Sequence, residues 1–261
     1  ECNFMGFEYL TNVPLAQARK EYLERLVSGG FGSKTETIPV FESCGRVTAK
    51  AVYAHICAPH YAASAMDGVA VSAKETFGAT ETTPVTLKPD QFLVLDTGDP
   101  IPEDKDAVIM VEDIVKNGDG SITIHAAAAP WQHIRQIGED VCAGEMILPS
   151  HMTVFPAAIG AMIAGGVLEI EVIRKPVVGI IPTGDEIIPP CTDPKPGDIL
   201  EFNGSIFSAM VRSWGAEAVV YPIVPDKFDQ IKEMVAKAAD ECDMVILNAG
   251  SSAGREDFSA R

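Results

Sequence analysis

The sequence predicts a multidomain protein that combines an α/β part with a β-rich part. Its 261 residues exceed the usual size of a single hydrophobic core and favour about two domains. Short β-rich runs separated by turns fill residues 52–142, whereas strand and helix patterns alternate from residue 175 onwards. Because strands that alternate with helices build parallel sheets, we expect the C-terminal part to form a layered α/β sheet.

The composition is that of a globular protein and argues against several classes of function. Hydrophobic residues make up 47% of the chain and charged residues 22%. The net charge of −17 argues against a nucleic-acid partner, since binding to phosphates requires clustered Lys and Arg. No uninterrupted apolar run reaches the roughly 20 residues that span a bilayer, so we expect no membrane segment. The six cysteines show neither C-x-x-C nor metal-ligand spacing, which is typical of reduced thiols in a cytoplasmic protein.

The first part of the chain is predicted to begin with a helix. Pro14 fits the first turn, apolar residues recur at helical spacing over residues 15–27, and two glycines then end the helix. Residues 152–173 are predicted to form a short helix followed by a strand. Because residues 154–173 are strongly apolar, we expect them to need cover from a second copy of the chain.

Residues 52–142 are predicted to form a small β module. The strand candidates are short apolar runs bounded by turn residues. They comprise Gly68–Val71, Val85–Leu87, Phe92–Leu95, Ala107–Val111 and Ile122–Ile124. The turn cluster at residues 117–120 predicts a hairpin between residues 111–115 and 121–125.

From residue 175 the pattern predicts three strands and two helices. Residues 176–181 are apolar without alternation, as in a strand that is covered on both faces. The later elements are a helix at 206–214 ending at Gly215, a strand at 218–224, a helix at 228–238 and a strand at 244–247. The first helix is predicted to face the sheet with Ile206, Phe207, Met210, Val211 and Trp214. Because the chain ends at Arg261, we expect this unit to be incomplete at its C-terminus.

Two loops at the carboxyl ends of the α/β strands form the candidate binding site, since ligands of open parallel sheets bind there. They cover residues 183–186 and 248–257. Small residues let backbone N–H groups approach a phosphate, hydroxyls add donors, and carboxylates suit Mg²⁺. The alternative is that both are ordinary strand-to-helix turns, in which Gly, Ser, Thr and Asp are the commonest residues. Neither loop matches the P-loop or the dinucleotide fingerprint, so the residues alone leave both interpretations open.

Five motifs, in order along the chain, resemble those of one family. They are Ser64-Ala65-Met66-Asp67-Gly68-Val69-Ala70-Val71, Thr97–Pro102 with Asp106-Ala107-Val108, Ile134-Arg135-Gln136-Ile137-Gly138-Glu139-Asp140, Thr183-Gly184-Asp185-Glu186-Ile187, and Asn248 to Asp257. Together they are similar to the signature segments of the molybdopterin molybdenumtransferases, the family that includes MoeA and the gephyrin E domain. The resemblance is specific because the motifs are collinear and extend over most of the chain.

This resemblance implies a domain organisation. An elongated N-terminal domain would comprise residues 1–51 and 143–174, and a β-rich domain would be inserted into it at residues 52–142. An α/β domain like the molybdopterin-binding fold would follow at residues 175–261, incomplete at its C-terminus. A β-barrel domain would come after it in the family.

The resemblance also implies a reaction and a set of site residues. The reaction is the ligation of molybdate, or tungstate, to adenylylated molybdopterin with release of AMP, carried out with Mg²⁺ by a cytoplasmic homodimer. Carried over by motif, the catalytic carboxylates would be Asp67, Asp140 and Asp257. The cofactor-binding residues would be Thr183, Gly184, Asp185, Glu186, Asn203, Gly250, Ser251 and Ser252. The metal would be held by Asp185 and Asp257.

Two alternatives remain beside this reaction. Asn248-Ala249-Gly250-Ser251-Ser252 stands where Ser-Gly-Gly-Val-Ser is common in the family, which leaves the choice between molybdenum and tungsten open. The first alternative is a non-catalytic protein that binds molybdopterin, and tight pterin binding without AMP release would distinguish it. The second is a scaffold protein that contacts other proteins of cofactor biosynthesis, and a partner peptide bound in an apolar groove would support it.

Overall fold

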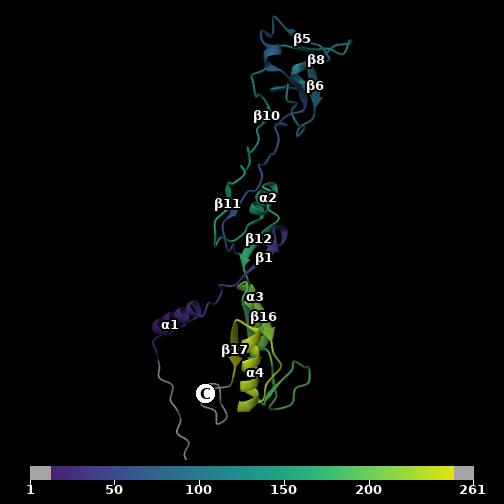
Figure 1. The fold of residues 1–261 in the computed structure, drawn as a ribbon. Helices are drawn as coiled ribbons and strands as arrows, with labels where there is room; N and C mark the ends of the chain where they lie inside the picture. The colour runs from purple at the N-terminus through teal and green to yellow at the C-terminus, as the bar shows by residue number, and fades with distance from the viewer. Residues whose placement is uncertain (1–12, 250–261) are drawn as a thin grey trace, which may run out of the picture. The chain divides into compact units, whose positions relative to one another are not determined.

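The computed structural model describes residues 13–249, and Figure 1 shows its helices and strands. Within these residues the chain forms two compact units, residues 13–35 with 173–249 and residues 36–172. We call the first the α/β unit and the second the β unit, after their main elements.

A three-stranded parallel sheet forms the centre of the α/β unit. Its strands are β13 (Val177–Pro182), β16 (Glu217–Val220) and β17 (Met244–Asn248), in the order β16-β13-β17. In the register of the sheet, Pro182 at the end of β13 lies opposite Asn248 at the end of β17. The central strand β13 is buried along nearly its whole length, which explains why its apolar residues run without alternation.

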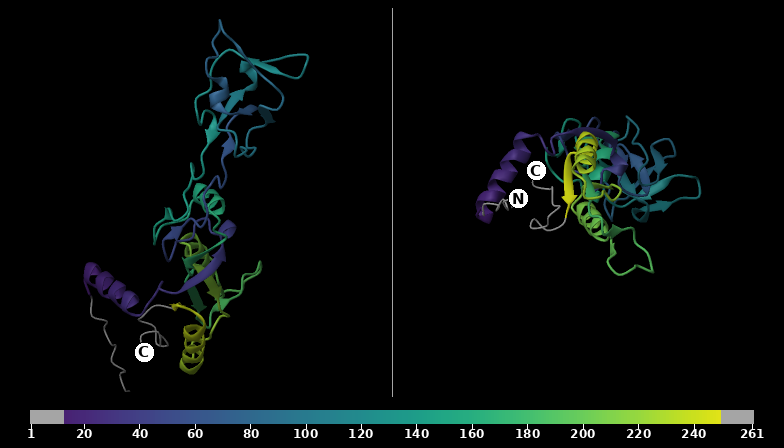
Figure 2. Two further views of the ribbon diagram at one scale, coloured as in Figure 1. Left: turned by 45° about the horizontal axis from the view of Figure 1, so that its top comes forward. Right: turned by 90° about the horizontal axis from the view of Figure 1, so that it is seen from below.

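Two helices cover this sheet, α3 (Asn203–Ser213) and α4 (Phe228–Glu241). On the α4 side, Ile181 of β13 belongs to one buried cluster with Ile231 and Ala238. A Cβ atom on Gly179 would stand 3.0 Å from the ring of Tyr221 and 3.6 Å from the Cβ of Ala238, so a larger residue would crowd this contact. Helix α3 packs on β13 and β16, and the right-hand view in Figure 2 shows it on the side of the sheet opposite α4.

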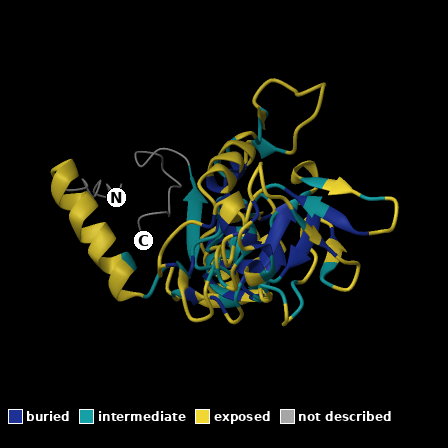
Figure 3. Ribbon diagram, turned by 90° about the horizontal axis from the view of Figure 1, so that it is seen from above, coloured by how far each residue is buried: buried dark blue, intermediate teal, exposed yellow. Residues whose placement is uncertain are grey.

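The other elements of the α/β unit lie outside the three-stranded sheet. Strands β14 (Ile187–Ile188) and β15 (Ile199–Leu200) form a short parallel pair. Helix α1 (Leu15–Ser28) confirms the predicted N-terminal helix, but it has no buried residue and is coloured almost entirely as exposed in Figure 3. None of the helices in residues 13–249 is both long enough and apolar enough to cross a bilayer.

The β unit consists mainly of short strands. One antiparallel sheet has β4 (Gly68–Val71) between β6 (Phe92–Leu95) and β7 (Ala107–Met110), and a second has β9 (Ile122–Ile124) between β5 (Val85–Leu87) and β8 (Ile114–Lys116). The strand pairs are β1 (Thr35–Pro39) with β12 (Glu169–Ile173), β2 (Val52–Tyr53) with β11 (Met146–Leu148), and β3 (Ala63–Ser64) with β10 (Ile134–Arg135). The helical elements are the 3-10 turns η1 (Val40–Glu42), η2 (Ala73–Thr76) and η3 (Val111–Asp113) and the α-helix α2 (Pro156–Ala164).

The β unit contains separate hydrophobic cores. The largest includes Leu87 and Ile124 from the β5-β9-β8 sheet, and another surrounds helix α2. In the second core Val154, Met162 and Val172 are at most 1% exposed. Phe155, Ile163 and Leu168 of the same stretch are 45%, 49% and 69% exposed, so the expected cover by a second copy of the chain stays a prediction.

Most predicted elements are confirmed, with one correction to a helix face. The five strand candidates of residues 52–142 are strands, and the predicted hairpin is the β8–β9 pair. In α3, Val211 is buried as predicted, but three residues assigned to the same face are at least 40% exposed: Ile206, Met210 and Trp214. The buried face instead includes Gly204 and Ser208, because small side chains let α3 lie close to β16. The strand predicted at 218–224 ends earlier, at Val220.

Candidate functional site

A hollow of about 550 Å³ opens at the carboxyl edge of the three-stranded sheet. Its walls come from the end of β13, the loop after it, the segment before α3 and the chain after β16. The lining residues are Pro182, Gly184, Asp185, Ile187, Pro189, Pro190, Glu201, Val220, Tyr221, Pro222, Ile223 and Pro225. A mainly apolar wall with a few polar groups, at this volume, is typical of small-molecule sites.

Hydrogen bonds to neighbouring segments hold the first predicted loop in place. Thr183 is 4% exposed, and its N–H and its hydroxyl both donate to the carbonyl oxygen of Asn248, at 2.9 and 3.1 Å. The N–H of Gly184 donates to the carbonyl oxygen of Val224 at 3.1 Å. Gly184 has a φ of +143°, and a Cβ there would stand 2.6 Å from Cγ1 of Ile187, so the turn requires glycine. These donors therefore support the hollow, whereas we expected them to face a phosphate.

The acidic pair that follows is exposed and largely free of protein partners. Oδ1 of Asp185 accepts one long hydrogen bond, from the N–H of Asp226 at 3.3 Å. Within residues 13–249, the N–H groups of Asp185 and Glu186 make no hydrogen bond. Asp185 also lines the hollow. The loop thus offers a ligand two exposed carboxylates, of which Asp185 lines the hollow, and two backbone donors.

The segment before α3 supplies a second carboxylate, Glu201, from a three-residue segment in which only Asn203 was predicted as a site residue. Glu201 is half-buried, lines the hollow, and accepts a hydrogen bond at Oε1 from the N–H of Gly204 at 2.6 Å. Asn203, the residue predicted from the motif, is the first residue of α3 and does not line the hollow. Glu201 lies two residues before the first residue of α3, and its hydrogen bond satisfies one of the free N–H groups in the first turn of the helix.

The second predicted loop is described only at its start. Asn248 ends β17 opposite Pro182, so the two loops leave the same edge of the sheet from adjacent strands. Gly250, Ser251, Ser252 and Asp257 lie outside the described residues. Their assigned roles stay predictions.

In the β unit, Asp67 precedes β4 and holds a turn. Its Oδ1 accepts hydrogen bonds from both the hydroxyl and the N–H of Thr97, each at 2.7 Å. The Thr97 hydroxyl, and then its N–H, lower the pKa of Asp67 below its usual value because both stabilise the charged form. Asp67 is therefore an exposed carboxylate that stays charged, with one oxygen engaged by the Thr97 turn.

Asp140 follows β10 and pairs with Arg135. Nη2 of Arg135 lies 2.5 Å from Oδ1 of Asp140, and its Nε lies 3.4 Å from Oε1 of Glu139. Asp140, followed by Glu139, raises the pKa of Arg135, so the cation stays charged beside both carboxylates. Asp67 and Asp140 belong to the β unit, whereas the loop at residues 183–186 belongs to the α/β unit.

A metal ion at the hollow would find few protein ligands. Within residues 13–249, no three His, Cys, Asp or Glu side chains come together as a metal-binding cluster. Mg²⁺ commonly uses only one or two carboxylates, with water and substrate phosphates as its other ligands. Asp185 is a carboxylate of this kind at the edge of the hollow.

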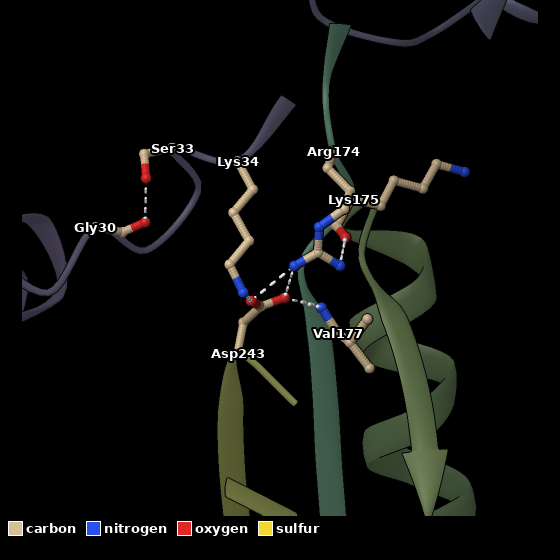
Figure 4. A network of polar contacts seen from close by, with 7 residues as sticks. All are labelled: Gly30, Ser33, Lys34, Arg174, Lys175, Val177 and Asp243. Atoms are coloured by element: carbon tan, nitrogen blue, oxygen red, sulfur yellow. Dashed lines mark hydrogen bonds and ion pairs between the residues drawn. The ribbon is translucent and has the colours of Figure 1, made fainter. Parts of the chain in front are cut away.

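The opposite, amino edge of the same sheet carries a dense polar network (Figure 4). Asp243, whose side chain is 11% exposed, receives Nζ of Lys34 at 2.8 Å, Nη2 of Arg174 at 2.7 and 2.5 Å, and the N–H of Val177 at 2.8 Å. Burial alone raises the pKa of Asp243, but Lys34, the Val177 N–H and Arg174 outweigh it and lower the pKa to about 2. The network fastens the start of β17 to the start of β13.

Two family models match the chain in succession. Residues 13–166 match the model described as the MoeA N-terminal region (domain I and II). Residues 179–261 match the model described as a probable molybdopterin binding domain. The second match includes both loops of the carboxyl edge.

Individual proteins of this family are also similar to the chain. The chain is 35% identical over 234 residues to molybdopterin molybdenumtransferase 2 of Mycobacterium tuberculosis, covering 84% of the chain and 58% of that protein. It is 31% identical over 257 residues to the molybdopterin molybdenumtransferase of Haemophilus influenzae, covering 94% and 63%. A crystal structure of the molybdopterin biosynthesis MoeA protein from Pyrococcus horikoshii has a TM-score of 0.76 at 29% identity, covering 91% of this chain and 63% of that one.

The chain spans about three fifths of the length of these relatives. The matching family model for the N-terminal region extends over more than half of the chain, and the solved relative has the same fold at moderate identity. The chain belongs to the MoeA family.

Proposed function

We propose that this chain contributes the molybdopterin-binding part of a molybdenumtransferase. The proposed reaction is the ligation of molybdate, or tungstate, to adenylylated molybdopterin with release of AMP. The names of the relatives support this class of substrate, and the match of residues 179–261 to a molybdopterin-binding model supports the α/β unit as the place of binding.

The observation that carries this proposal is the hollow at the carboxyl edge of the sheet. Ligands of parallel α/β sheets bind outside this edge. Its proline and isoleucine walls suit a flat ring system, and the carboxylates of Asp185 and Glu201 are acceptors for the N–H groups of a pterin. The combination of apolar walls and two acceptors matches one face of such a ligand.

The phosphate of the substrate is proposed to bind beside Asp185. The N–H groups of Asp185 and Glu186 point to no protein acceptor within residues 13–249, and adjacent backbone donors bind anions in many proteins. Gly250, Ser251 and Ser252 are proposed to complete this cradle because their loop follows the adjacent strand. The chain carries a net charge of −17, so a bound phosphate depends on local donors such as backbone N–H groups.

The donor chemistry of this edge fits Mg²⁺. Asp185, together with Asp257, is proposed to hold the ion, and the phosphate oxygens of the substrate would complete its ligands. When bound, Mg²⁺ supplies positive charge that offsets the charge of the phosphates. The protein's own contribution is to orient the phosphate by the backbone donors of Asp185 and Glu186.

Asp67 and Asp140 are proposed to act on the substrate through their carboxylate groups, within a homodimer. Each has one carboxylate oxygen engaged, by Thr97 and by Arg135 respectively, and this holds the side chain in one orientation. Sedimentation of the chain at micromolar concentration tests the dimer, and a monomer would contradict it.

The first experiment is calorimetric titration of the chain with free and with adenylylated molybdopterin in the presence of Mg²⁺. We expect the adenylylated form to bind and molybdate to release AMP, detected by chromatography. Asp185→Asn should weaken binding by about tenfold, equivalent to about 1.4 kcal/mol. Asp193→Asn is the matched control, because Asp193 is an exposed carboxylate on the loop between β14 and β15, outside the hollow.

The outcomes separate the candidate functions. Pterin binding without AMP release would favour the non-catalytic alternative. Equal affinities of the Asp185→Asn and Asp193→Asn variants would contradict the proposed role of the loop. Failure of the unmodified chain to bind either pterin would contradict the placement of the site on this unit.

A further inference from the structure

Two segments of the β unit run side by side where the chain enters and leaves its β-rich part. Ala58 and Val141 form an antiparallel bridge, with hydrogen bonds of 2.8 Å from the N–H of Ala58 and 3.1 Å from the N–H of Val141. The N–H of Ala54 donates to the carbonyl oxygen of Glu145 at 2.9 Å, which keeps the same register four residues away. Hydrogen bonds therefore hold the two segments together on both sides of residues 55–57 and 142–144.

Cys57 and Cys142 occupy directly opposite positions in this register. Because Ala58 and Val141 exchange both of their hydrogen bonds, the neighbouring pair is a non-hydrogen-bonded pair. In such pairs the Cα atoms are about 4.5 Å apart and the side chains lie on the same face, which is within the range that disulfides require.

The thiols themselves are gathered around Gly138. The point where a Cβ of Gly138 would stand is 2.9 Å from Sγ of Cys142 and 3.5 Å from Sγ of Cys57, so the sulfurs are no farther apart than the sum of these distances. Sγ of Cys142 donates to the carbonyl oxygen of Gly138 at 3.3 Å, and Sγ of Cys57 accepts from the N–H of Ala143 at 3.4 Å. The absent side chain of Gly138, with φ of +78°, leaves the space that both sulfurs share.

The two cysteines differ in their exposure to solvent. Cys142 is exposed and Cys57 is half-buried, and both are free thiols in the structure. An exposed thiol next to a partner thiol is the arrangement in which one cysteine attacks the external disulfide first and the second resolves the mixed disulfide.

We propose that Cys57 and Cys142 form a reversible disulfide by exchange with a low-molecular-weight disulfide such as oxidised glutathione. The Cys142 thiolate attacks one sulfur of the small disulfide, which forms a mixed disulfide and releases one small thiol. The Cys57 thiolate then attacks the Cys142 sulfur and releases the second small thiol. The two protein thiols are oxidised by two electrons, the small disulfide is reduced to two thiols, and the two protein protons pass to the released thiolates.

The bond would close a loop around the sheets formed by β4 to β9 and would fix the segment that carries Asp140. The N–H of Asp140 donates to the carbonyl oxygen of Ala58 at 2.9 Å, so this residue already depends on the contact between the two segments. Cross-links that close long loops restrict the unfolded chain most strongly. Oxidation is therefore expected to stabilise the β-rich part and to slow local opening of both segments.

The test is a redox titration of the full 261-residue chain in mixtures of reduced and oxidised glutathione, followed by alkylation and mass spectrometry. We expect the intact mass to fall by two hydrogens and proteolysis to yield a peptide in which Cys57 is linked to Cys142. Dithiothreitol should reverse the change. Hydrogen exchange should slow at residues 54–60 and 138–145 in the oxidised chain.

Single variants distinguish the pair from general thiol reactivity. Cys57→Ser and Cys142→Ser should each abolish the cross-link and leave the remaining thiol with one bound glutathione. Cys44→Ser and Cys191→Ser are matched controls, because both residues are exposed free cysteines in other parts of the chain, and the cross-link should persist in them. Separate glutathione adducts on Cys57 and Cys142 in the unmodified chain, or cross-links only between chains, would overturn the proposal.

Discussion

The two edges of the parallel sheet use carboxylates in opposite ways. At the amino edge, Asp243 is 11% exposed and receives two cationic side chains and a backbone N–H. At the carboxyl edge, Asp185 is exposed and has one long contact, to the N–H of Asp226. The same side chain is thus saturated by the protein at one edge and left almost free at the other.

This difference separates a carboxylate that maintains the fold from one that is available to a ligand. A buried charge is tolerated only when the protein supplies its partners. The cationic partners of Asp243 are Lys34, where the chain leaves the α/β unit, and Arg174, where it returns. An exposed carboxylate beside unpaired backbone donors keeps its binding capacity for a ligand or ion. A substitution at Asp243 should therefore lower stability, whereas a substitution at Asp185 should weaken binding and leave stability nearly unchanged.

The largest expected effect on stability is that of Asp243→Asn. The amide removes the negative charge and places a donor against Lys34 and Arg174, so the free energy of unfolding should fall by about 2 kcal/mol. Lys34 and Arg174 are partly exposed and can be hydrated again, which keeps the loss below that of a fully buried pair. Urea denaturation followed by circular dichroism measures the change.

The matched control is Asp240→Asn, which alters an exposed carboxylate on the same helix-to-strand segment. Its effect should stay within about 0.5 kcal/mol, as for most surface substitutions. Equal losses in the two variants would show that the network at Asp243 does not stabilise the sheet.

The contribution of Asp243 should also depend on pH in a defined direction. Its pKa in the folded chain is lowered from the usual 3.8 to about 2, so in acid the unfolded chain takes up a proton first. The stabilisation is therefore complete above about pH 4 and is lost as the pH falls towards 2. The difference in unfolding free energy between the unmodified chain and Asp243→Asn should shrink over this range and stay constant above it.

A smaller effect on stability is expected at Glu201, which contributes both to the fold and to the proposed binding site. Its Oε1 accepts the N–H of Gly204 in the first turn of α3, and its side chain lines the hollow. Glu201→Ala should cost about 1 kcal/mol of stability through the lost cap, and it should also weaken pterin binding. Glu201→Gln keeps an acceptor for the cap, so it should retain stability and lose affinity. Unchanged affinity in both variants would remove Glu201 from the proposed site.

Sequence patterns predicted the elements of this chain better than their contacts. The uninterrupted apolar run of β13 and the turn between β8 and β9 are local signals, and both strands are where the patterns placed them. The face of α3 was mispredicted because Gly204 and Ser208, which hydrophobic periodicity ignores, allow the close approach to β16.

In the candidate site, too, the sequence predicted the position of a loop but not its contacts. The motif identified the loop at residues 183–186. It could not reveal that the hydroxyl of Thr183 donates a hydrogen bond to the carbonyl oxygen of Asn248, 65 residues away in the sequence. The network of Asp243 and the closeness of Cys57 to Cys142 also depend on contacts between distant segments. Such contacts are set by strand register and by the fold as a whole, and residue spacing does not contain them.

The smallest effect on stability is expected for Asp185→Asn, the variant that should weaken pterin binding most. Asp185→Asn should change the free energy of unfolding by less than about 0.5 kcal/mol, since the exposed side chain has only the 3.3 Å contact with the N–H of Asp226, which an amide oxygen also accepts. Urea denaturation beside Asp193→Asn measures this, on the same samples used for calorimetry. A loss of stability as large as that of Asp243→Asn would mean that Asp185 holds the loop together. The contrast between the two edges would then fail, because the weaker pterin binding of the variant would follow from a disordered hollow and not from a missing ligand group.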